Sequence, residues 1–213
     1  GYMVTGYLTD SAGHTRYFDT KTGIMARGWM TDSKGYKYYF TSGEGVMAKG
    51  WLENSKGQFR YFSKSNGRML TGFQKDTKGN TRYFNPSTGI MATGLKKIEG
   101  YYFYFAKSNG VRYQKGFGTV GNNKYYFSPK NGRAQTGWLT LDGKRYYFSS
   151  KGVMYVNRTA TIDGTTYSFD KNGVATESKY EINGKTVQVY DSGNKRTYTL
   201  MKEFLEHPGI ENG

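Results

Sequence analysis

The chain has 213 residues, of which 36% are hydrophobic and 17% are aromatic, with 21 Tyr, 13 Phe and 3 Trp. Such aromatic content excludes a disordered chain, and the absence of cysteine excludes a disulfide framework and a Cys-ligated metal site. The formal net charge of +15 favours anionic partners, with nucleic acid and acidic surface polymers as the candidates.

An internal repeat runs through most of the chain. A glycine, followed in most units by an aromatic residue, recurs every 21 or 22 residues at Gly6-Tyr7, Gly28-Trp29, Gly50-Trp51, Gly72-Phe73, Gly94-Leu95, Gly116-Phe117 and Gly137-Trp138. A Tyr-Phe step follows in each unit, at Tyr17-Phe18, Tyr39-Phe40, Tyr61-Phe62, Tyr83-Phe84, Tyr104-Phe105, Tyr126-Phe127 and Tyr147-Phe148. A further glycine precedes the next unit, at Gly23, Gly45, Gly67, Gly89, Gly110 and Gly132. Markers that stay in phase over so many units predict a repeat architecture.

Each unit predicts a β-hairpin, with the Gly-aromatic step on the first strand and the Tyr-Phe step on the second. The first four units separate these steps by DSAG, DSKG, NSKG and DTKG, which we interpret as four-residue loops with glycine at a positive φ. Later units shorten the turn to Asp142-Gly143, Asp163-Gly164 and Asn183-Gly184. One hairpin cannot bury its apolar face, so we expect an all-β solenoid of about nine stacked hairpins of roughly 20–22 residues.

Side chains alternate along a strand, so in KYYF we expect Tyr38 and Phe40 on one face and Tyr39 on the other. Phe18, Phe40, Phe62 and their equivalents are predicted to form the core. A methionine follows the inter-hairpin glycine by two residues in four units, at Met25, Met47, Met69 and Met91. We expect these methionines to stack as a rung inside the solenoid, with ligand contact as the alternative.

The repeat decays beyond residue 155. We predict regular hairpins over 1–155, degenerate capping repeats over 156–195, and a tail or linker to a missing domain over 196–213. Leu200, Met201, Phe204 and Leu205 fit one helical face, which predicts a helix near residues 199–206. The first residues match the middle of a repeat, so we interpret the chain as a piece of a longer protein.

Units such as TGWLTLDGKRYYFSSKGVM resemble the cell-wall-binding repeats of secreted Gram-positive proteins. That superfamily includes choline-binding modules, the glucan-binding repeats of glucansucrases and the C-terminal repeats of large clostridial toxins. The resemblance covers about residues 1–195. It implies a secreted, cell-wall-associated protein that attaches to polysaccharide or teichoic acid, beside a covalently linked catalytic domain.

The branch of the superfamily is judged from the second-strand position where choline-binding units carry tryptophan. This sequence has Thr15, Lys37, Phe59, Thr81, Tyr102, Lys124 and Arg145 there. Basic residues in an aromatic cage disfavour a quaternary ammonium ligand, and the G-K-x-Y-Y-F form is closer to the glucan and toxin branch. We therefore expect a glucan or anionic wall polymer as ligand, with choline on teichoic acid as the alternative.

The predicted ligand-binding residues are the first-strand aromatics, the second-strand tyrosines and three basic residues. Aromatic rings stack on the apolar faces of sugars, and basic side chains contact anionic groups. The predicted residues are Tyr7, Trp29, Trp51, Phe73, Phe117, Trp138, Tyr39, Tyr61, Tyr83, Tyr104, Tyr126, Tyr147, Lys37, Lys124 and Arg145. Lys64, Lys107 and Lys130 are interpreted as a solvated rim.

No catalytic or metal-binding constellation is visible in the sequence. The two histidines, His14 and His207, lie in a predicted turn and in the tail. The repeated Asp10, Asp32, Asp76 and Asp142 are interpreted as turn residues. We therefore predict a non-enzymatic protein without cofactor or metal and without a membrane span. Nucleic-acid binding is the weaker alternative, because the basic residues follow the repeat rather than gathering on one module.

Overall fold

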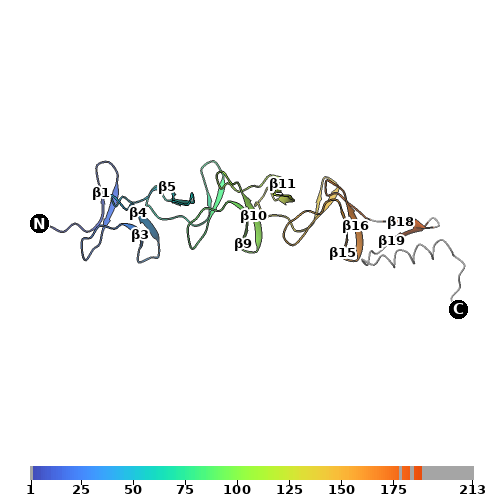
Figure 1. The fold of residues 1–213 in the computed structure, drawn as a ribbon, viewed down its shortest axis with the longest axis horizontal. Coiled ribbons are helices and arrows are strands. Elements are labelled where there is room, and N and C mark those ends of the chain that lie inside the picture. The colour runs from blue at the N-terminus through green and yellow to red at the C-terminus, as the bar shows by residue number, and fades with distance from the viewer. Residues whose placement is uncertain (1, 178, 183–184, 189–213) are drawn as a thin grey trace, which may run out of the picture. The chain divides into compact units, whose positions relative to one another are not determined.

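The computed structural model describes residues 2–177, 179–182 and 185–188, and every regular element in these ranges is a β-strand (Figure 1). The first ten strands are β1 (Gly6–Thr9), β2 (Thr15–Phe18), β3 (Gly28–Thr31), β4 (Lys37–Phe40), β5 (Gly50–Glu53), β6 (Phe59–Phe62), β7 (Gly72–Lys75), β8 (Thr81–Phe84), β9 (Gly94–Ile98) and β10 (Tyr101–Phe105). The others are β11 (Gly116–Val120), β12 (Asn123–Phe127), β13 (Gly137–Leu141), β14 (Lys144–Phe148), β15 (Arg158–Ile162), β16 (Thr165–Phe169), β17 (Ala175–Glu177), β18 (Lys179–Ile182) and β19 (Lys185–Gln188).

The strands pair two by two in chain order as antiparallel hairpins, β1 with β2, β3 with β4 and so on, and β17 adds a third strand to the hairpin of β15 and β16. The predicted all-β hairpin repeat is therefore confirmed. The helix predicted near 199–206, the 196–213 tail and the Asn183-Gly184 turn lie outside the described residues.

The loops of the first four hairpins are one residue longer than the sequence suggested. Thr9 pairs with Thr15, which leaves five residues between the strand ends. The loop is closed by two hydrogen bonds, from the Asp10 N–H to the His14 carbonyl at 3.0 Å and from the Gly13 N–H to the Asp10 carbonyl at 2.9 Å. Gly13 has a φ of 83°, as predicted, because the chain reverses through a left-handed residue there.

The shorter turns of later hairpins follow the prediction. Leu141 pairs with Lys144, so only Asp142 and Gly143 connect the strands. Their φ values of 49° and 71° are both positive, as a type I′ turn requires. Local sequence therefore determines the hairpin connection.

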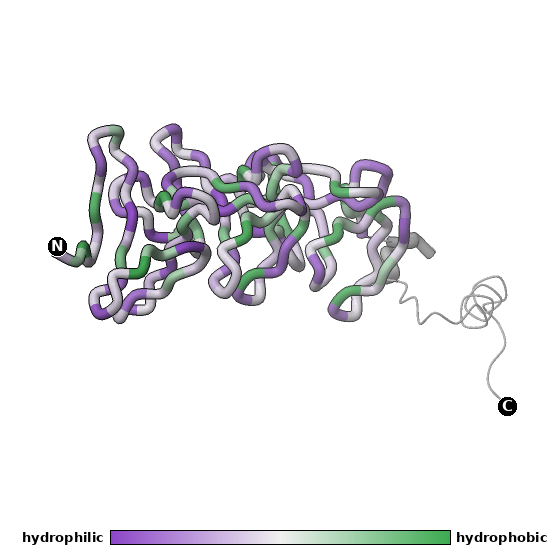
Figure 2. Tube along the Cα trace, turned by 60° about the vertical axis from the view of Figure 1, so that its left-hand side comes forward, coloured by the Kyte–Doolittle hydropathy of each residue, from purple (hydrophilic) through white to green (hydrophobic). Residues whose placement is uncertain are grey.

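The chain divides into two compact units. Unit 1 comprises Gly1–Lys97 and Phe103–Tyr113, and unit 2 comprises Ile98–Tyr102 and Gln114–Gly213. The tube in Figure 2 shows that hydrophobic residues recur in short stretches, separated by hydrophilic segments. Each hairpin therefore contributes a few hydrophobic residues to a small local core.

The phenylalanine that ends each second strand is the centre of that local core. Phe40, Phe62, Phe105, Phe127 and Phe148 are fully buried. Tyr38 is also buried beside Phe40, whereas Tyr39 is only half-buried, so the predicted alternation of faces is confirmed. Phe18, in the first hairpin, is half-buried.

In unit 1, methionines link successive hairpins. The Met47 N–H donates to the Thr15 carbonyl of the preceding hairpin at 2.7 Å, and the Met69 N–H donates to the Lys37 carbonyl at 2.8 Å. Met47 is buried. Its sulfur lies only 2.5 Å from the position that a Cβ atom would take on Gly67, which is too close for a side chain there unless the methionine shifts. The methionine rung is thus a structural contact between repeats, and the glycine leaves room for it.

Unit 2 repeats the arrangement with some different residues. The Met154 N–H donates to the Lys124 carbonyl at 2.8 Å, and the Met154 methyl group lies 2.8 Å from the place of a Cβ on Gly173. Tyr146, Phe148 and Met154 form the buried cluster. Ala134 replaces methionine in the preceding repeat, next to Gly152.

Candidate aromatic binding sites

The first-strand aromatics lie on the second-strand tyrosines predicted to share the site with them. Antiparallel register places Trp29 opposite Tyr39 and Trp51 opposite Tyr61. Ring centroids are 4.8–5.2 Å apart in the pairs Tyr7–Tyr17, Trp29–Tyr39, Trp51–Tyr61, Phe73–Tyr83, Phe117–Tyr126 and Trp138–Tyr147. The fifth hairpin carries Leu95 at the first-strand position, and Tyr104 is half-buried in β10.

Each first-strand aromatic also contacts a ring of the next hairpin. The centroid distances are 6.1 Å for Trp29–Phe62, 6.0 Å for Trp51–Phe84 and 5.0 Å for Phe117–Tyr146. Trp29 nevertheless keeps 51% of its surface exposed and Trp51 keeps 49%. These side chains therefore serve both as packing between hairpins and as an open aromatic surface.

An arginine accompanies the two tryptophans of unit 1. The Arg60 Cζ lies 5.3 Å from the Trp29 ring centroid, and the Arg82 Cζ lies 5.5 Å from that of Trp51. We call these clusters the Trp29 site (Trp29, Tyr39, Arg60 and Phe62) and the Trp51 site (Trp51, Tyr61, Arg82 and Phe84). Sequence reasoning missed both arginines.

The signal for this position is present in the repeat. It is the residue two before the buried phenylalanine, occupied by Arg16, Tyr38, Arg60, Arg82, Phe103, Tyr125, Tyr146 and Tyr167. Strand alternation assigns it to the inner face. Only the stacking of hairpins brings that face against the outer aromatic of the preceding hairpin, as for Phe73–Phe103 at 5.3 Å and Trp138–Tyr167 at 4.7 Å.

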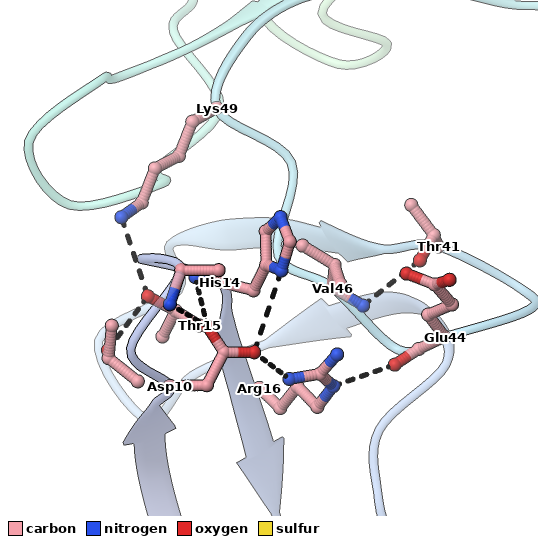
Figure 3. Close-up of polar contacts among 10 residues, drawn as sticks. Asp10, His14, Thr15, Arg16, Thr41, Glu44, Val46 and Lys49 are labelled. Atoms are coloured by element: carbon pink, nitrogen blue, oxygen red, sulfur yellow. Dashed lines mark hydrogen bonds and ion pairs between the residues drawn. The ribbon is translucent and has the colours of Figure 1, made fainter.

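Arg16 illustrates how the arginines at this position are held (Figure 3). Its Nε donates to the Glu44 carbonyl at 3.0 Å, and its Nη1 donates to the Asp10 carboxylate at 2.8 Å. Asp10 Oδ1 accepts the His14 N–H at 2.9 Å, so the loop aspartate orders both the turn and the arginine. Asp10 is therefore a turn residue, as predicted.

Arg82 repeats this arrangement in the fourth hairpin. Its Nε donates to the Asn109 carbonyl at 2.9 Å and its Nη1 to Asp76 at 2.9 Å. This hydrogen bond from Arg82 lowers the pKa of Asp76 to about 2. The guanidinium over Trp51 is consequently neutralised by a carboxylate that stays ionised at neutral pH.

The Trp138 cluster in unit 2 contains a basic residue that the sequence did predict. The Arg145 Cζ lies 4.0 Å from the Trp138 ring centroid and 5.3 Å from that of Tyr167. Trp138 also contacts Tyr147 at 5.1 Å. The structure thus brings Trp138, Tyr147 and Arg145 together as expected.

The two predicted ligand-binding lysines have intramolecular acceptors. Lys37 Nζ donates to the Ser87 carbonyl at 3.2 Å, and Lys124 Nζ donates to the Lys171 carbonyl at 2.9 Å. Both bonds cross to a loop two hairpins further along the chain. These lysines therefore tether repeats.

Tyr7, Tyr17 and Tyr38 form a tyrosine cluster in which no described cationic side chain lies over a ring. The Tyr38 hydroxyl donates to Asp32 at 3.1 Å and accepts a hydrogen bond from Arg68 Nε at 3.3 Å. Partial burial, with smaller contributions from Tyr38 and Asp32, raises the pKa of Tyr7 to about 12. Tyr7 is therefore a neutral phenol at physiological pH, although about half of the residue is exposed.

The described residues contain no group of three or more His, Cys, Asp or Glu side chains placed to hold a metal ion. Within the same part of the chain, no helix is long and apolar enough to cross a membrane. Lys64, Lys107 and Lys130 are exposed, as the rim interpretation requires. The candidate sites are therefore built from aromatic and basic residues.

A family model described as choline-binding repeat matches residues 26–72, 114–158 and 135–180, which together make up more than half of the chain. The chain belongs to the choline-binding repeat family. No curated protein is significantly similar to it in sequence.

Solved structures agree with this assignment. Choline binding protein F from Streptococcus pneumoniae is 30% identical with a TM-score of 0.67, over 81% of this chain and 57% of that protein. CbpJ from the same species is 29% identical with a TM-score of 0.69, over 81% and 58% of the two chains. The modular autolysin LytC of S. pneumoniae, 22% identical with a TM-score of 0.52 over 86% and 46%, supports the fold alone. The chain thus spans a little over half the length of the first two proteins.

Proposed function

We propose that the chain is a non-catalytic module that attaches an exported bacterial protein to a surface polysaccharide or wall polymer. The observation that carries the proposal is the partly exposed aromatic pair within the hairpin, which recurs in six repeats with ring centroids 4.8–5.2 Å apart. Such rings stack on the apolar faces of sugars, and repeated sites suit a repeated polymer. Family membership supports the proposal, as does the structure of choline binding protein F in the presence of a peptidoglycan analogue.

The ligand class that we favour is a glucan or an anionic wall polymer. All three tryptophans have an arginine guanidinium 4.0–5.5 Å from the ring centroid. At Trp29 and Trp138, where no described carboxylate forms an ion pair with the arginine, a quaternary ammonium group would be repelled, whereas sugars and anions would be accepted.

Choline on teichoic acid is the second candidate, and the tyrosine cluster of Tyr7, Tyr17 and Tyr38 supports it. Tyr7 lies 4.8 Å from Tyr17 and 6.3 Å from Tyr38 by ring centroids. Several aromatic faces around one point are the arrangement that holds a quaternary ammonium by cation–π attraction.

Retention on dextran, purified cell wall and choline resin tests these ligands. Salt-resistant retention on dextran supports glucan, retention on cell wall that is lost in salt supports an anionic polymer, and elution by free choline supports the second candidate. A folded protein retained by none of the three contradicts the proposed function. Binding to single-stranded nucleic acid, equally for all sequences and lost in moderate salt, would instead support the nucleic-acid alternative.

We also propose that a catalytic domain, such as a wall hydrolase, is linked to this chain in the full protein. The change of composition after Gly193 motivates the idea. The parent gene tests it. An open reading frame that encodes repeats alone would contradict it.

A further inference from the structure

The Trp29 and Trp51 sites are two consecutive copies of the same framework. The tryptophan meets the tyrosine of its own hairpin at 5.2 and 4.8 Å, and the buried phenylalanine of the next hairpin at 6.1 and 6.0 Å. The arginine lies 5.3 and 5.5 Å from the ring centroid. Any difference in ligand preference between them must therefore come from the groups around this framework.

One such difference is the loop residue that faces the arginine. Asp10 and Asp76 accept a hydrogen bond from Arg16 and Arg82 at 2.8 and 2.9 Å. The third hairpin has Asn54 at the equivalent position. Its amide nitrogen donates to Gln58 at 3.0 Å, so it neither neutralises Arg60 nor accepts from it.

Arg60 is held in place but retains unused donors. Its Nε donates to the Thr88 carbonyl at 2.8 Å, the same tether that Arg16 and Arg82 form. Among the described residues, no carboxylate forms an ion pair with Arg60. Neither Nη nitrogen of Arg60 is among the described polar atoms that are buried and lack a hydrogen bond. These Nη groups therefore reach solvent beside the exposed half of Trp29.

A second difference is the residue that begins the second strand of the hairpin. Phe59 begins β6 and lies against Trp51 at 6.2 Å, and the equivalent residue of the preceding hairpin, at the start of β4, is Lys37. The Trp29 site thus contains a guanidinium with no carboxylate partner among the described residues, and Lys37 of the same hairpin donates to the Ser87 carbonyl. The Trp51 site instead combines an Arg–Asp ion pair with an additional aromatic ring.

We propose that the Trp29 site binds an oxyanion of the polymer, a phosphodiester or a carboxylate, through the free edge of Arg60 while the adjoining sugar or polyol stacks on Trp29. A guanidinium presents paired N–H donors that match the oxygens of both groups. The Trp51 site lacks this selectivity because Asp76 already occupies Arg82. The inference rests on the proposed function and specifies the ligand chemistry of one of its sites.

Two reciprocal substitutions test the inference. Asn54→Asp supplies the missing carboxylate, and Asp76→Asn removes the one at the Trp51 site. Both residues accept loop N–H groups through Oδ1 at 2.9–3.0 Å, so each replacement keeps the turn. Asn131→Asp, in a loop of unit 2, is the control for the change in net charge. Near-UV circular dichroism and urea midpoints verify the fold of each variant.

Affinity is measured by calorimetry for poly(glycerol phosphate), for oligogalacturonate and for neutral dextran oligomers. We expect Asn54→Asp to weaken binding of at least one anionic probe by about tenfold or more, because a charge-assisted hydrogen bond is lost. Binding of dextran should stay unchanged. Asp76→Asn should strengthen binding of the same anionic probe, and Asn131→Asp should leave it within about twofold, because it adds the same charge outside the Trp29 and Trp51 sites. If only poly(glycerol phosphate) loses affinity in Asn54→Asp, the bound oxyanion is a phosphodiester; if only oligogalacturonate does, it is a carboxylate.

Three outcomes are decisive. Wild-type protein that binds an anionic probe with the same affinity as folded Asn54→Asp contradicts the inference and leaves the proposed function intact. Wild-type protein that binds dextran but neither anionic probe also contradicts the inference and leaves the proposed function intact. Wild-type protein that binds none of these probes and is not retained on cell wall contradicts the proposed function itself.

Discussion

At the scale of single residues, glycine and aspartate determine where each repeat turns and how closely repeats approach. Gly67 has a φ of 72°, and the sulfur of Met47 lies 2.5 Å from where its Cβ would be. Gly43, by contrast, has no atom within 4 Å of the position that its own Cβ would take, and its φ is not positive. The two glycines therefore differ in function although they lie in adjacent inter-hairpin segments.

Gly67→Ala should lower the free energy of unfolding by at least about 1–2 kcal/mol, the cost of a left-handed non-glycine residue. Displacing the flexible end of Met47 adds to this cost. Gly43→Ala is the matched control and should leave stability unchanged or slightly raised. Urea denaturation measures both, and equal midpoints for the two variants would show that the Met47–Gly67 contact is unimportant.

The Asp76–Arg82 hydrogen bond should make stability depend on acid pH. The pKa of Asp76 is lowered from 3.8 to about 2 in the folded protein. Its stabilisation is therefore fully present above about pH 4 and is lost as the pH falls through about 2. The stability difference between wild type and Asp76→Asn should shrink over this window. An NMR titration in which the Asp76 carboxyl group has its midpoint near 4 would refute this.

At the scale of elements, each hairpin relies on one buried phenylalanine and on its neighbours. Phe62 ends β6 and is fully buried. Its ring centroid lies 6.1 Å from that of Trp29 in the preceding hairpin. It also forms an isolated bridge with Met69 in the following segment. Phe62 thus connects its own hairpin, through its backbone and its ring, to the following segment and to the candidate site in the preceding hairpin.

Phe62→Ala should destabilise unit 1 by about 3–5 kcal/mol, because it removes a fully buried ring and leaves a cavity. It should also perturb the near-UV signal of Trp29. Ile24→Ala, at an exposed side chain in an inter-hairpin segment, should change stability by less than about 0.5 kcal/mol. Chemical denaturation followed by circular dichroism compares them. A loss of similar size in both variants would contradict a core made of one phenylalanine per hairpin.

At the scale of the whole molecule, repetition is what makes weak sites useful. The six first-strand aromatics are distributed over both units, one in each of six hairpins. Simultaneous binding to one polymer raises the effective concentration for every further site. Affinity should consequently fall much more steeply than in proportion when several sites are removed.

Replacing Trp29, Trp51 and Trp138 together by alanine should abolish retention on the polymer that retains the wild type. Each single replacement should weaken the affinity for the polymer by only about tenfold or less. Linked sites together raise the affinity about 10²–10⁴-fold above that of one site, and the triple variant loses this gain. Retention on immobilised polymer and circular dichroism are measured in parallel for all four variants. A folded triple variant that is retained like the wild type would exclude the tryptophans as binding surfaces.

The hairpins, their turns and the alternation of strand faces were predictable from the sequence, because they depend on contacts between residues close in the chain. The pairing of Trp29 with Tyr39 follows from hairpin register, and the positive φ of Gly13 follows from turn chemistry. The extra loop residue was missed because the hydrogen bond from Asp10 to His14 extends the turn beyond the glycine.

What surrounds the aromatic pairs was decided only by tertiary structure. Arg60 reaches Trp29 from the next hairpin, and Lys37 extends to Ser87, 50 residues further along the chain. These contacts depend on the rotation from one hairpin to the next, which no local pattern encodes. Asn54 leaves Arg60 without a carboxylate inside its own hairpin, and only the stacking brings that unpaired guanidinium to Trp29 of the preceding hairpin. The sequence therefore determined the repeated unit, and the packing of the units determined the charge of each candidate site.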